Sequence, residues 1–391
     1  MNYILFDGNV RDALLPFTYT RPVADIRIGI LTIREKWEKL LGYTTTTITE
    51  EYLEDKFPMV EMEENVLINS SFLPTEELVA QIQSLNENEA VVYNEEIVAF
   101  YTKDTQDEVD FEAYNCIEIT EELIQVKNTW DIFYLNDKAI RLDFELLTEG
   151  RKSQPIPSTV QTVGAENIFI EEGAKLTFAT LNASSGPIYI GKDAEIMEGC
   201  LVRGPLAMCE NSVLKLGAKI YGATTLGPYS KVGGEVNNSV LFGYSNKGHD
   251  GFLGNSVLGE WCNLGADTNN SNLKNNYAEV RLWSYEKQGF AKTGLQFCGL
   301  MMGDHSKSGI NTMFNTGTVV GVSANIFGGN FPRNFIPSFS WGGSAGFTEY
   351  KMNKVNEVAK VVMKRRNIEY DEKEQQILQH VFDMSKEYRN Y

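Results

Sequence analysis

Hydrophobic residues recur at every sixth position through the middle of the chain. A helix has a period of 3.6 residues and a strand a period of 2, so neither explains a strict period of six. A parallel β-helix with short flat sides does explain it, because one aliphatic residue per side enters a narrow core. The positions four residues after each aliphatic residue are mostly small, as expected at corners. The aliphatic positions are Ile190, Ile196, Val202, Met208, Leu214, Ile220, Leu226 and Val232.

This period continues toward the C-terminus with two interruptions. The register slips by two residues near Asn237, and the pattern lapses over 269–297, where we expect an excursion from the solenoid. It returns over 302–326, and an earlier coil is expected at 170–176. We therefore predict a solenoid domain over residues 164–335. After the slip, the predicted core positions are Val240, Asn246, Phe252, Leu258 and Leu264.

The residues before the solenoid show a different pattern. Short apolar segments alternate with a helical pattern after Pro74, where Thr75 is a candidate N-cap. This alternation predicts an α/β domain over residues 1–150. Residues 151–163 have the composition of a linker.

Beyond the solenoid, residues 336–391 begin with a Gly- and Pro-rich stretch that predicts an irregular loop. Two amphipathic helical patterns follow, the second with Asp371 as a candidate N-cap.

Charge and cysteine usage narrow the class of protein. The formal net charge of -18 argues against nucleic acid or an anionic membrane as a partner. No apolar run reaches the length of a membrane span, and the N-terminus lacks the pattern of a signal peptide. Five scattered cysteines without a CxxC pair suit a reducing cytoplasm, and no His/Cys cluster has the spacing of a metal site.

The repeats resemble a known group of enzymes. The hexads "IGKDAE" and "LGPYSK" resemble those of the left-handed β-helix acyltransferases. The stretch "SNKGHDGFLGNSVLGEWCNLGADTNNSNL" is similar to the acetyltransferase half of a bifunctional family, which pairs N-acetylglucosamine-1-phosphate uridylyltransferase with glucosamine-1-phosphate N-acetyltransferase. The resemblance implies a left-handed parallel β-helix, a homotrimer and acetyl-CoA as co-substrate.

The same resemblance assigns candidate site residues. "NKGH" places His249 at the catalytic base, Asn272 matches an acetyl-donor contact, and Phe252 takes the place of an aromatic residue that binds sugar phosphate. Acylation of an amine needs a base with a pKa near 7, which is where histidine titrates. From the residues alone, a surface histidine in a turn is an equally good account of His249.

Further candidates follow from position and charge. The Gly265–Ala266 turn offers backbone N–H groups for an oxyanion. Lys274 and Arg333 are candidate phosphate contacts. Asp304 and Lys307 flank His305 in a corner where donor binding or a subunit contact is expected.

The N-terminus is similar to the phosphate-binding loop of the sugar-phosphate nucleotidyltransferases in a divergent form. In "YILFDGNVRDALLPFTYTRPVAD", Gly8, Arg11 and Arg21 are candidate nucleotide or phosphate ligands, while Val23 stands where the family has Lys. Ser70 or Ser71 takes the place of the carboxylate that holds Mg²⁺. Mg²⁺ is therefore expected only if this domain is active, with Asp7 or Asp25 as replacement ligands.

Three functions remain open at this stage. The first is an acetyl-CoA-dependent N-acetyltransferase that acts on an amino-sugar phosphate in nucleotide-sugar biosynthesis. The second is a bifunctional enzyme that also transfers a nucleotide from UTP or dTTP to a sugar-1-phosphate. The third is a non-catalytic oligomeric scaffold or nucleotide-sugar sensor, which would not need the His249 and Asn272 set.

Overall fold

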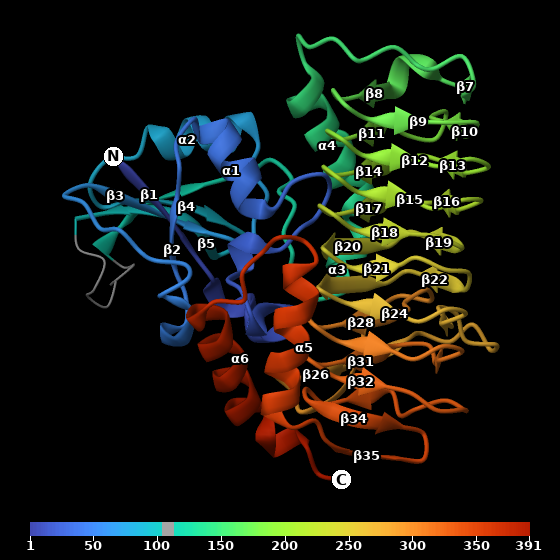
Figure 1. Cartoon of the computed structure of the whole chain (residues 1–391). Helices are drawn as coiled ribbons and strands as arrows, with labels where there is room; N and C mark the ends of the chain where they lie inside the picture. Colours follow the sequence, from blue (N-terminus) through green and yellow to red (C-terminus); the bar gives the residue numbers. More distant parts are fainter. Residues whose placement is uncertain (104–112) are drawn as a thin grey trace.

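The computed structural model describes residues 1–103 and 113–391. An N-terminal α/β unit lies beside a parallel β-solenoid, and two C-terminal helices lie against both (Figure 1). This confirms the predicted fold class. Among the described residues, no helix combines the length and the apolar character that crossing a membrane requires.

The N-terminal unit is built on a six-stranded mixed sheet in the order β2-β1-β3-β5-β4-β6. β1 pairs in parallel with β2 and β3, and β5 runs antiparallel to β3. Thr75 caps α2 as predicted, since its hydroxyl accepts the N–H of Leu78. The strands are β1 Asn2–Phe6, β2 Thr46–Ile48, β3 Asn65–Asn69, β4 Glu89–Tyr93, β5 Glu96–Thr102 and β6 Asn115–Glu118, and the helices are α1 Ile33–Leu41, α2 Glu76–Gln83, α3 Asp131–Tyr134 and α4 Asn136–Thr148.

The solenoid has three sheets, which we name by what faces them. The domain-facing sheet comprises β8 Ile168–Ile170, β11 Ile188–Ile190, β14 Leu206–Met208, β17 Thr224–Leu226, β20 Val240–Gly243, β23 Val257–Glu260, β28 Leu300–Met302, β31 Thr318–Val320 and β33 Phe335–Ile336. The helix-facing sheet comprises β9 Lys175–Leu176, β12 Glu195–Ile196, β15 Val213–Leu214, β18 Lys231–Val232, β21 Asn246–Lys247, β24 Asn263–Leu264, β29 Lys307–Ser308, β32 Asn325–Ile326, β34 Ser340–Gly343 and β35 Gly346–Glu349.

The third or open sheet lies on the side away from the N-terminal unit (Figure 1). It comprises β7 Gln161–Val163, β10 Thr180–Asn182, β13 Leu201–Arg203, β16 Lys219–Tyr221, β19 Glu235–Asn237 and β22 Phe252–Gly254, and the pair β25 Asn269–Asn270 and β30 Met313–Phe314 follows it. The predicted excursion is a hairpin of β26 Arg281–Ser284 and β27 Gly289–Lys292.

All eight aliphatic positions of the first hexads are buried in the solenoid core, as predicted. The predicted register after the slip is wrong by one residue over one coil. Leu226 pairs with Leu241, Val232 with Lys247 and Val236 with Leu253, so the core residues are Leu241, Lys247 and Leu253. The reason is that the steps between core residues shorten at three corners and not at one: between Val232 and Val236, between Val236 and Leu241, and between Leu253 and Leu258, where the two registers meet again.

The solenoid also extends beyond the predicted boundaries. β7 begins before residue 164, and the stretch after residue 330 holds β33 and the β34–β35 hairpin where an irregular loop was expected. Gly residues here allow positive φ angles, as at Gly342 and Gly346, and do not end the coils.

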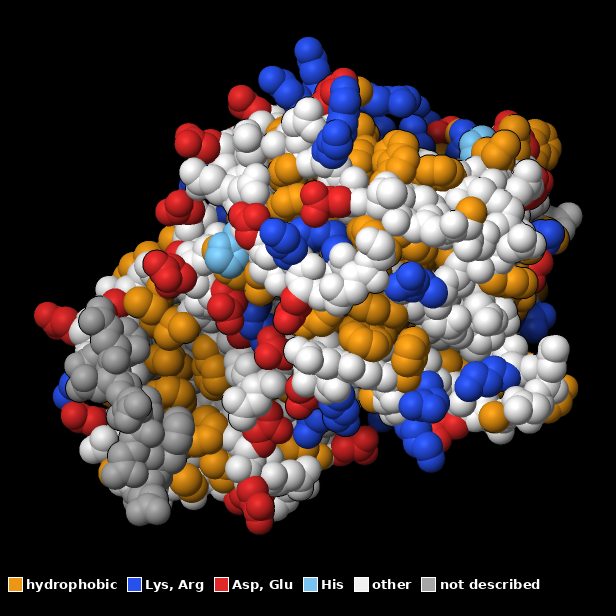
Figure 2. Space-filling model, turned by 90° about the horizontal axis from the view of Figure 1, so that it is seen from below, with side chains coloured by type: hydrophobic (Ala, Val, Ile, Leu, Met, Phe, Trp, Pro, Cys, Tyr) orange, Lys and Arg blue, Asp and Glu red, His pale blue; other side chains and the backbone are white. Residues whose placement is uncertain are grey.

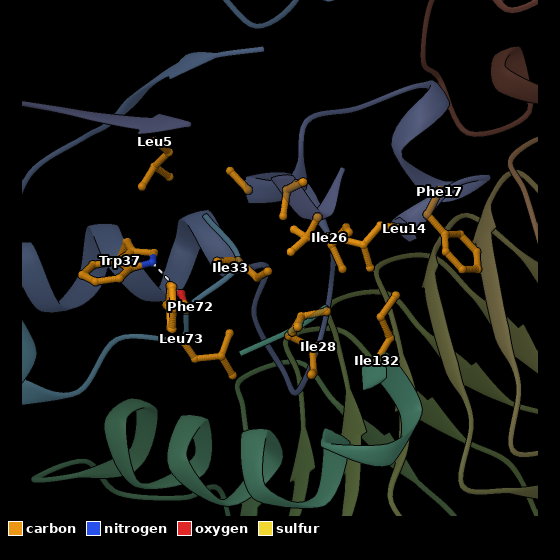
Figure 3. Packing of buried hydrophobic residues seen from close by; sticks show 14 of the residues in the cluster. Leu5, Leu14, Phe17, Ile26, Ile28, Ile33, Trp37, Phe72, Leu73 and Ile132 are labelled. Atoms are coloured by element: carbon orange, nitrogen blue, oxygen red, sulfur yellow. Dashed lines mark hydrogen bonds between the residues drawn. The ribbon is translucent and has the colours of Figure 1, made fainter. Parts of the chain in front are cut away.

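The N-terminal unit and the solenoid share one apolar core. Figure 3 shows the N-terminal part of this core, with Phe17 beside the solenoid strands and the Trp37 indole bonded to the Phe72 carbonyl. The ring of Phe17 lies 5.2 Å from that of Phe242 in the domain-facing sheet. Arg27 Nε donates to the Phe242 carbonyl at 3.0 Å. This contact could not be predicted from the sequence, because the outward residues of the solenoid do not follow its period.

The C-terminal helices α5 (Met352–Lys364) and α6 (Glu372–Met384) join the other two parts. Past the end of α5, Arg366 donates to Asn246 on the helix-facing sheet at 3.2 Å. α6 lies against the N-terminal unit, where His380 stacks on Tyr52 with ring centroids 4.2 Å apart. Asp371 caps α6 as predicted. Helices therefore cover one face of the solenoid and the N-terminal unit another.

Candidate functional site

His249 lies at the corner between β21 of the helix-facing sheet and β22 of the open sheet, and its side chain is exposed. The backbone of this corner lies between the corresponding corners of the coils before and after it. A Cβ on Gly234 would lie 2.8 Å from the His249 carbonyl oxygen, and the N–H of Asp267 in the next coil donates to the Asp250 carbonyl at 3.0 Å. The imidazole is thus presented to solvent from a backbone fixed on both sides.

Lys247 holds the same corner from inside the solenoid. It occupies a core position next to Val232, and 2% of its surface is exposed. Its Nζ donates to the His249 carbonyl at 2.6 Å. Burial lowers the pKa of Lys247 to about 8, while Asp250 and Asp267 oppose that shift. The predicted register had placed Asn246 at this position, so sequence reasoning missed the buried ammonium.

Phe252 and Asn272 are brought together on the open sheet. A Cβ on Gly254 would lie 2.5 Å from Phe252 Cζ and 2.7 Å from Asn272 Nδ2, so the absence of a side chain there allows both groups their places. Asn272 Nδ2 also donates to Asn255 Oδ1 at 2.8 Å. Phe252 is thus the first residue of β22, His249 lies three residues before it, and the Asn272 side chain lies beside Gly254 at the other end of the strand.

Asparagine side chains support this part of the open sheet. The side chain of Asn270 is buried, and it accepts the Gly254 N–H at 2.9 Å and donates to the Gly254 carbonyl at 3.0 Å. Asn269 accepts the Phe252 N–H at 2.8 Å. These amides replace the strand pairing that β22 lacks on that side.

The Gly265–Ala266 turn lies one coil beyond His249. The Gly265 N–H already donates to the Ser308 carbonyl at 3.0 Å, and the Ala266 carbonyl accepts the Asn311 N–H. The expectation that the Gly265 N–H is free to bind an oxyanion is therefore wrong. Of this pair, the Ala266 N–H remains a candidate.

Asp304 and Lys307 do not join the His249 corner. Asp304 is buried, pairs with Arg21, and accepts hydrogen bonds from the Thr20 hydroxyl and the Glu260 N–H. Lys307 Nζ donates to the His305 carbonyl at 2.7 Å beneath α5, where burial lowers its pKa to about 8. Asp304 therefore connects the solenoid to the N-terminal unit, and α5 covers Lys307, so neither group is open to a donor molecule.

Lys274 and Arg333 meet in one cavity of about 820 Å³. The β26–β27 hairpin forms one wall of this cavity, and residues near the C-terminus form another. The sequence predicted the two residues as separate phosphate contacts. It showed the hairpin beside them only as an interruption of the six-residue period, so their common cavity was not predicted.

The predicted N-terminal phosphate ligands are engaged elsewhere. Arg11 pairs with Asp7 at 2.7 Å and donates to the Thr18 carbonyl, and Arg21 is buried with Asp304 and Glu260. Gly8 lies against the Asn69 side chain. Neither guanidinium is open to a phosphate in this arrangement.

Among the described residues, the side chains at the carboxyl edge of β3 do not suit Mg²⁺. Ser71 bonds to Asn69 and accepts from Gln125, while Asp7 accepts three hydrogen bonds and Asp25 pairs with Arg34. The described residues contain no group of three or more His, Cys, Asp or Glu side chains placed to hold a metal ion. The residues present do not fit a Mg²⁺ ion bridging phosphates.

Comparisons with known proteins agree with this organisation. Residues 3–152 match the family model described as sugar nucleotidyl transferase. A bifunctional sugar-1-phosphate nucleotidylyltransferase/acetyltransferase of Sulfurisphaera tokodaii is 31% identical over 37% of this chain and 36% of its own length. The bifunctional protein GlmU of Synechococcus elongatus is 24% identical over 55% of this chain and 48% of its own. The resemblance to the bifunctional family is confirmed, and these relatives are transferases.

The matches span about a third to a half of the length of these relatives. Among solved structures, the polysialic acid-specific acetyltransferase NeuO covers 49% of this chain and 85% of its own at 10% identity, with a TM-score of 0.27.

Proposed function

We propose that this chain is an acetyl-CoA-dependent N-acetyltransferase that acts on an amino-sugar phosphate, with His249 as general base. The observation that carries the proposal is an exposed imidazole on a corner fixed by a buried lysine, with Phe252 and Asn272 on the strand and corner that follow. This is the arrangement that the resemblance assigns to base, sugar and donor.

The chemistry follows from these positions. The neutral amine nitrogen adds to the thioester carbonyl, and the imidazole of His249 takes the proton that this nitrogen loses. The tetrahedral intermediate then collapses, a C–N bond replaces the C–S bond, and the imidazolium returns the proton to the sulfur, so that coenzyme A leaves as the thiol. Asn272 would orient the donor, and Ala266 would offer its N–H near the oxyanion.

A second copy of the chain is part of this proposal. Apolar side chains are exposed along the corners in line with His249, with 65% of the surface exposed for Phe178, 66% for Leu216 and 70% for Ile310. The open sheet adds Val163 and Leu201. A cyclic homotrimer would cover this surface and supply a second wall to the His249 corner.

We propose no nucleotidyl transfer by the N-terminal unit. The segment around Gln125 crosses the carboxyl edge of β3, where Val126 donates to the Ser71 carbonyl and Gln125 to the Ser71 hydroxyl. The described part of this unit offers no free carboxylate at that edge and no free guanidinium at Arg11 or Arg21, so the charge of a triphosphate would not be neutralised there. The bifunctional names of the relatives favour the alternative, in which this unit still transfers a nucleotide.

The test measures release of free coenzyme A from acetyl-CoA with a panel of amino-sugar phosphates and sugar nucleotides. We expect His249→Ala to lower kcat by about 10²–10⁴-fold, with little change in acetyl-CoA affinity. Asn263→Ala, an exposed change on the neighbouring strand β24, is the matched control and should keep full activity.

Near-normal kcat in His249→Ala would overturn the assignment of the base. A wild-type protein with no turnover on any acceptor would favour the scaffold or sensor. Pyrophosphate release from UTP or dTTP with Mg²⁺ and a hexose-1-phosphate, followed in the same preparations, would restore the bifunctional reading.

A further inference from the structure

The cavity that holds Lys274 and Arg333 is assembled from three distant parts of the chain. The β26–β27 hairpin contributes Arg281 and Trp283, the last coils contribute Phe335, and the C-terminal segment contributes Tyr388. Its volume of about 820 Å³ lies within the range of small-molecule sites. Among the described residues, its lining includes neither His249, Phe252 nor Asn272, although Lys274 follows Asn272 by two residues.

The charge of the cavity opposes that of the protein. Lys274, Arg281 and Arg333 line it against one carboxylate, Glu387, in a chain with a net charge of -18. Within residues 1–103 and 113–391, none of these three cations has a carboxylate within 4.0 Å. Unpaired cations gathered in a concave site favour an anion with several oxygens.

The cations are held in place by the backbone. Lys274 Nζ donates to the Glu279 carbonyl at 2.8 Å, and Arg281 Nη2 donates to the Phe290 carbonyl at 2.9 Å. Neither bond neutralises a charge, because a carbonyl is not ionised. Lys274 and Arg281 are therefore oriented while their charge remains available, and the Arg333 guanidinium lies 5.8 Å from the centre of the Phe347 ring.

Aromatic rings form the rest of the lining. Trp283 stacks on Phe335 with ring centroids 4.2 Å apart, and Phe290 meets Trp283 edge-on at 5.6 Å. Phe290 is 41% exposed, so a planar ring can reach its face. Figure 2, which views the end with the last coils and C-terminal helices, shows Lys and Arg side chains beside hydrophobic ones.

We infer that this cavity binds a nucleoside diphosphate group, with the phosphates on Lys274, Arg281 and Arg333 and the base against the aromatic rings. The shared chemistry is a planar ring joined to a diphosphate, which both an acyl-CoA and a nucleotide sugar carry. The inference goes beyond the proposed acetyl transfer, since it needs neither His249 nor Asn272.

The experiment titrates the full chain with ADP by calorimetry. We expect saturable binding that weakens at least tenfold in Arg281→Ala and in Arg333→Ala, and that weakens as salt is raised. Lys287→Ala removes a cation of the same hairpin that does not line the cavity and should leave the affinity unchanged. His249→Ala should also bind ADP normally, which separates this inference from the proposed function.

Competition identifies the source of the group. Coenzyme A that displaces ADP, and loses affinity in Arg281→Ala, assigns the site to an acyl donor. UDP-glucose that displaces ADP where coenzyme A does not assigns it to a nucleotide sugar. No ADP binding at millimolar concentration, or equal affinity in wild type and both arginine variants, would overturn the inference.

Discussion

At the residue scale, Lys247 is a buried charged residue in the solenoid core that bonds to the backbone of the proposed base. Lys247 replaces an aliphatic residue in the core and gives its ammonium to the carbonyl of His249. Placing a charge in an apolar core costs free energy, and for the same reason burial lowers the pKa of Lys247. We interpret Lys247 as a positioning residue that fixes the backbone from which His249 projects.

Lys247→Met tests this interpretation through pH. The pKa of Lys247 is about 8 in the folded chain and ordinary when unfolded, so the unfolded state binds more protons between pH 8 and about 10.5. The stability of the wild type should therefore rise relative to Lys247→Met across that window, by up to about 3 kcal/mol. Urea unfolding of both proteins at several pH values measures this difference.

The methionine variant should fold and lose acetyl transfer mainly through kcat, with KM little changed. Lys247→Arg, which restores a cation to the core, should recover part of kcat if the ammonium positions the corner. A difference in stability that stays constant from pH 8 to 10.5 would contradict the buried titrating lysine.

At the scale of elements, the end of the open sheet is held by asparagine side chains. β22 is the last strand of its ladder, and side-chain amides from the next coil bond to its backbone. Asn270 is buried and satisfies both the N–H and the carbonyl of Gly254 at the end of β22. Phe252 lies on the same strand, so the bonds that hold Gly254 also help to position this proposed substrate contact.

Asn270→Ala should therefore destabilise the chain by about 2–4 kcal/mol, because two buried backbone groups lose their partners. Asn269→Ala is the matched control. Asn269 is exposed, accepts the Phe252 N–H and donates to the Asp267 carbonyl. Water can satisfy both backbone groups after the substitution, so we expect a loss under about 1 kcal/mol. Chemical denaturation of the two variants measures both values, and equal losses would contradict the role of burial.

Elements also show what the sequence can predict here. The hexads of Ile190–Val232 are visible because each coil buries one aliphatic residue per side, and this constraint is local. The core position of Lys247 was hidden because the steps between core residues shorten before it, and a polar residue does not mark the shifted register. The strands after residue 330 were hidden because Gly and Pro suit both loops and tight coil corners.

The candidate site divides in the same way. His249, Phe252 and Asn272 follow one another in the sequence and lie on adjoining coils, so their grouping was predictable. Asp304 and Arg21 are 283 residues apart, and only the packing of the N-terminal unit on the solenoid joins them. Contacts of this kind leave no local pattern in a sequence.

For the whole molecule, the buried pair of Arg21 and Asp304 ties the N-terminal unit to the solenoid. The two side chains are 5% and 4% exposed, and Glu260 lies 3.4 Å from the same guanidinium nitrogen. A buried ion pair is costly to break on one side, because the remaining charge has no partner.

Asp304→Ala should destabilise the chain by about 3–5 kcal/mol. The surface pair of Lys354 and Glu357 provides the control, since both side chains are more than 60% exposed and Glu357→Ala should cost at most about 1 kcal/mol. Replacing both buried partners with Met and Leu should recover most of the loss, as measured by chemical denaturation. A small loss in Asp304→Ala would show that the pair does not hold the interface.

The contact of α6 with the N-terminal unit has a consequence for biosynthesis. Lys56 meets Glu374 across 318 residues of chain, and His380 stacks on Tyr52. A ribosome releases the N-terminal unit long before α6 is made, so the surface that α6 covers stays exposed while the coils are translated. The solenoid can assemble coil by coil during that time, whereas the N-terminal unit reaches its final packing only once the last helix arrives.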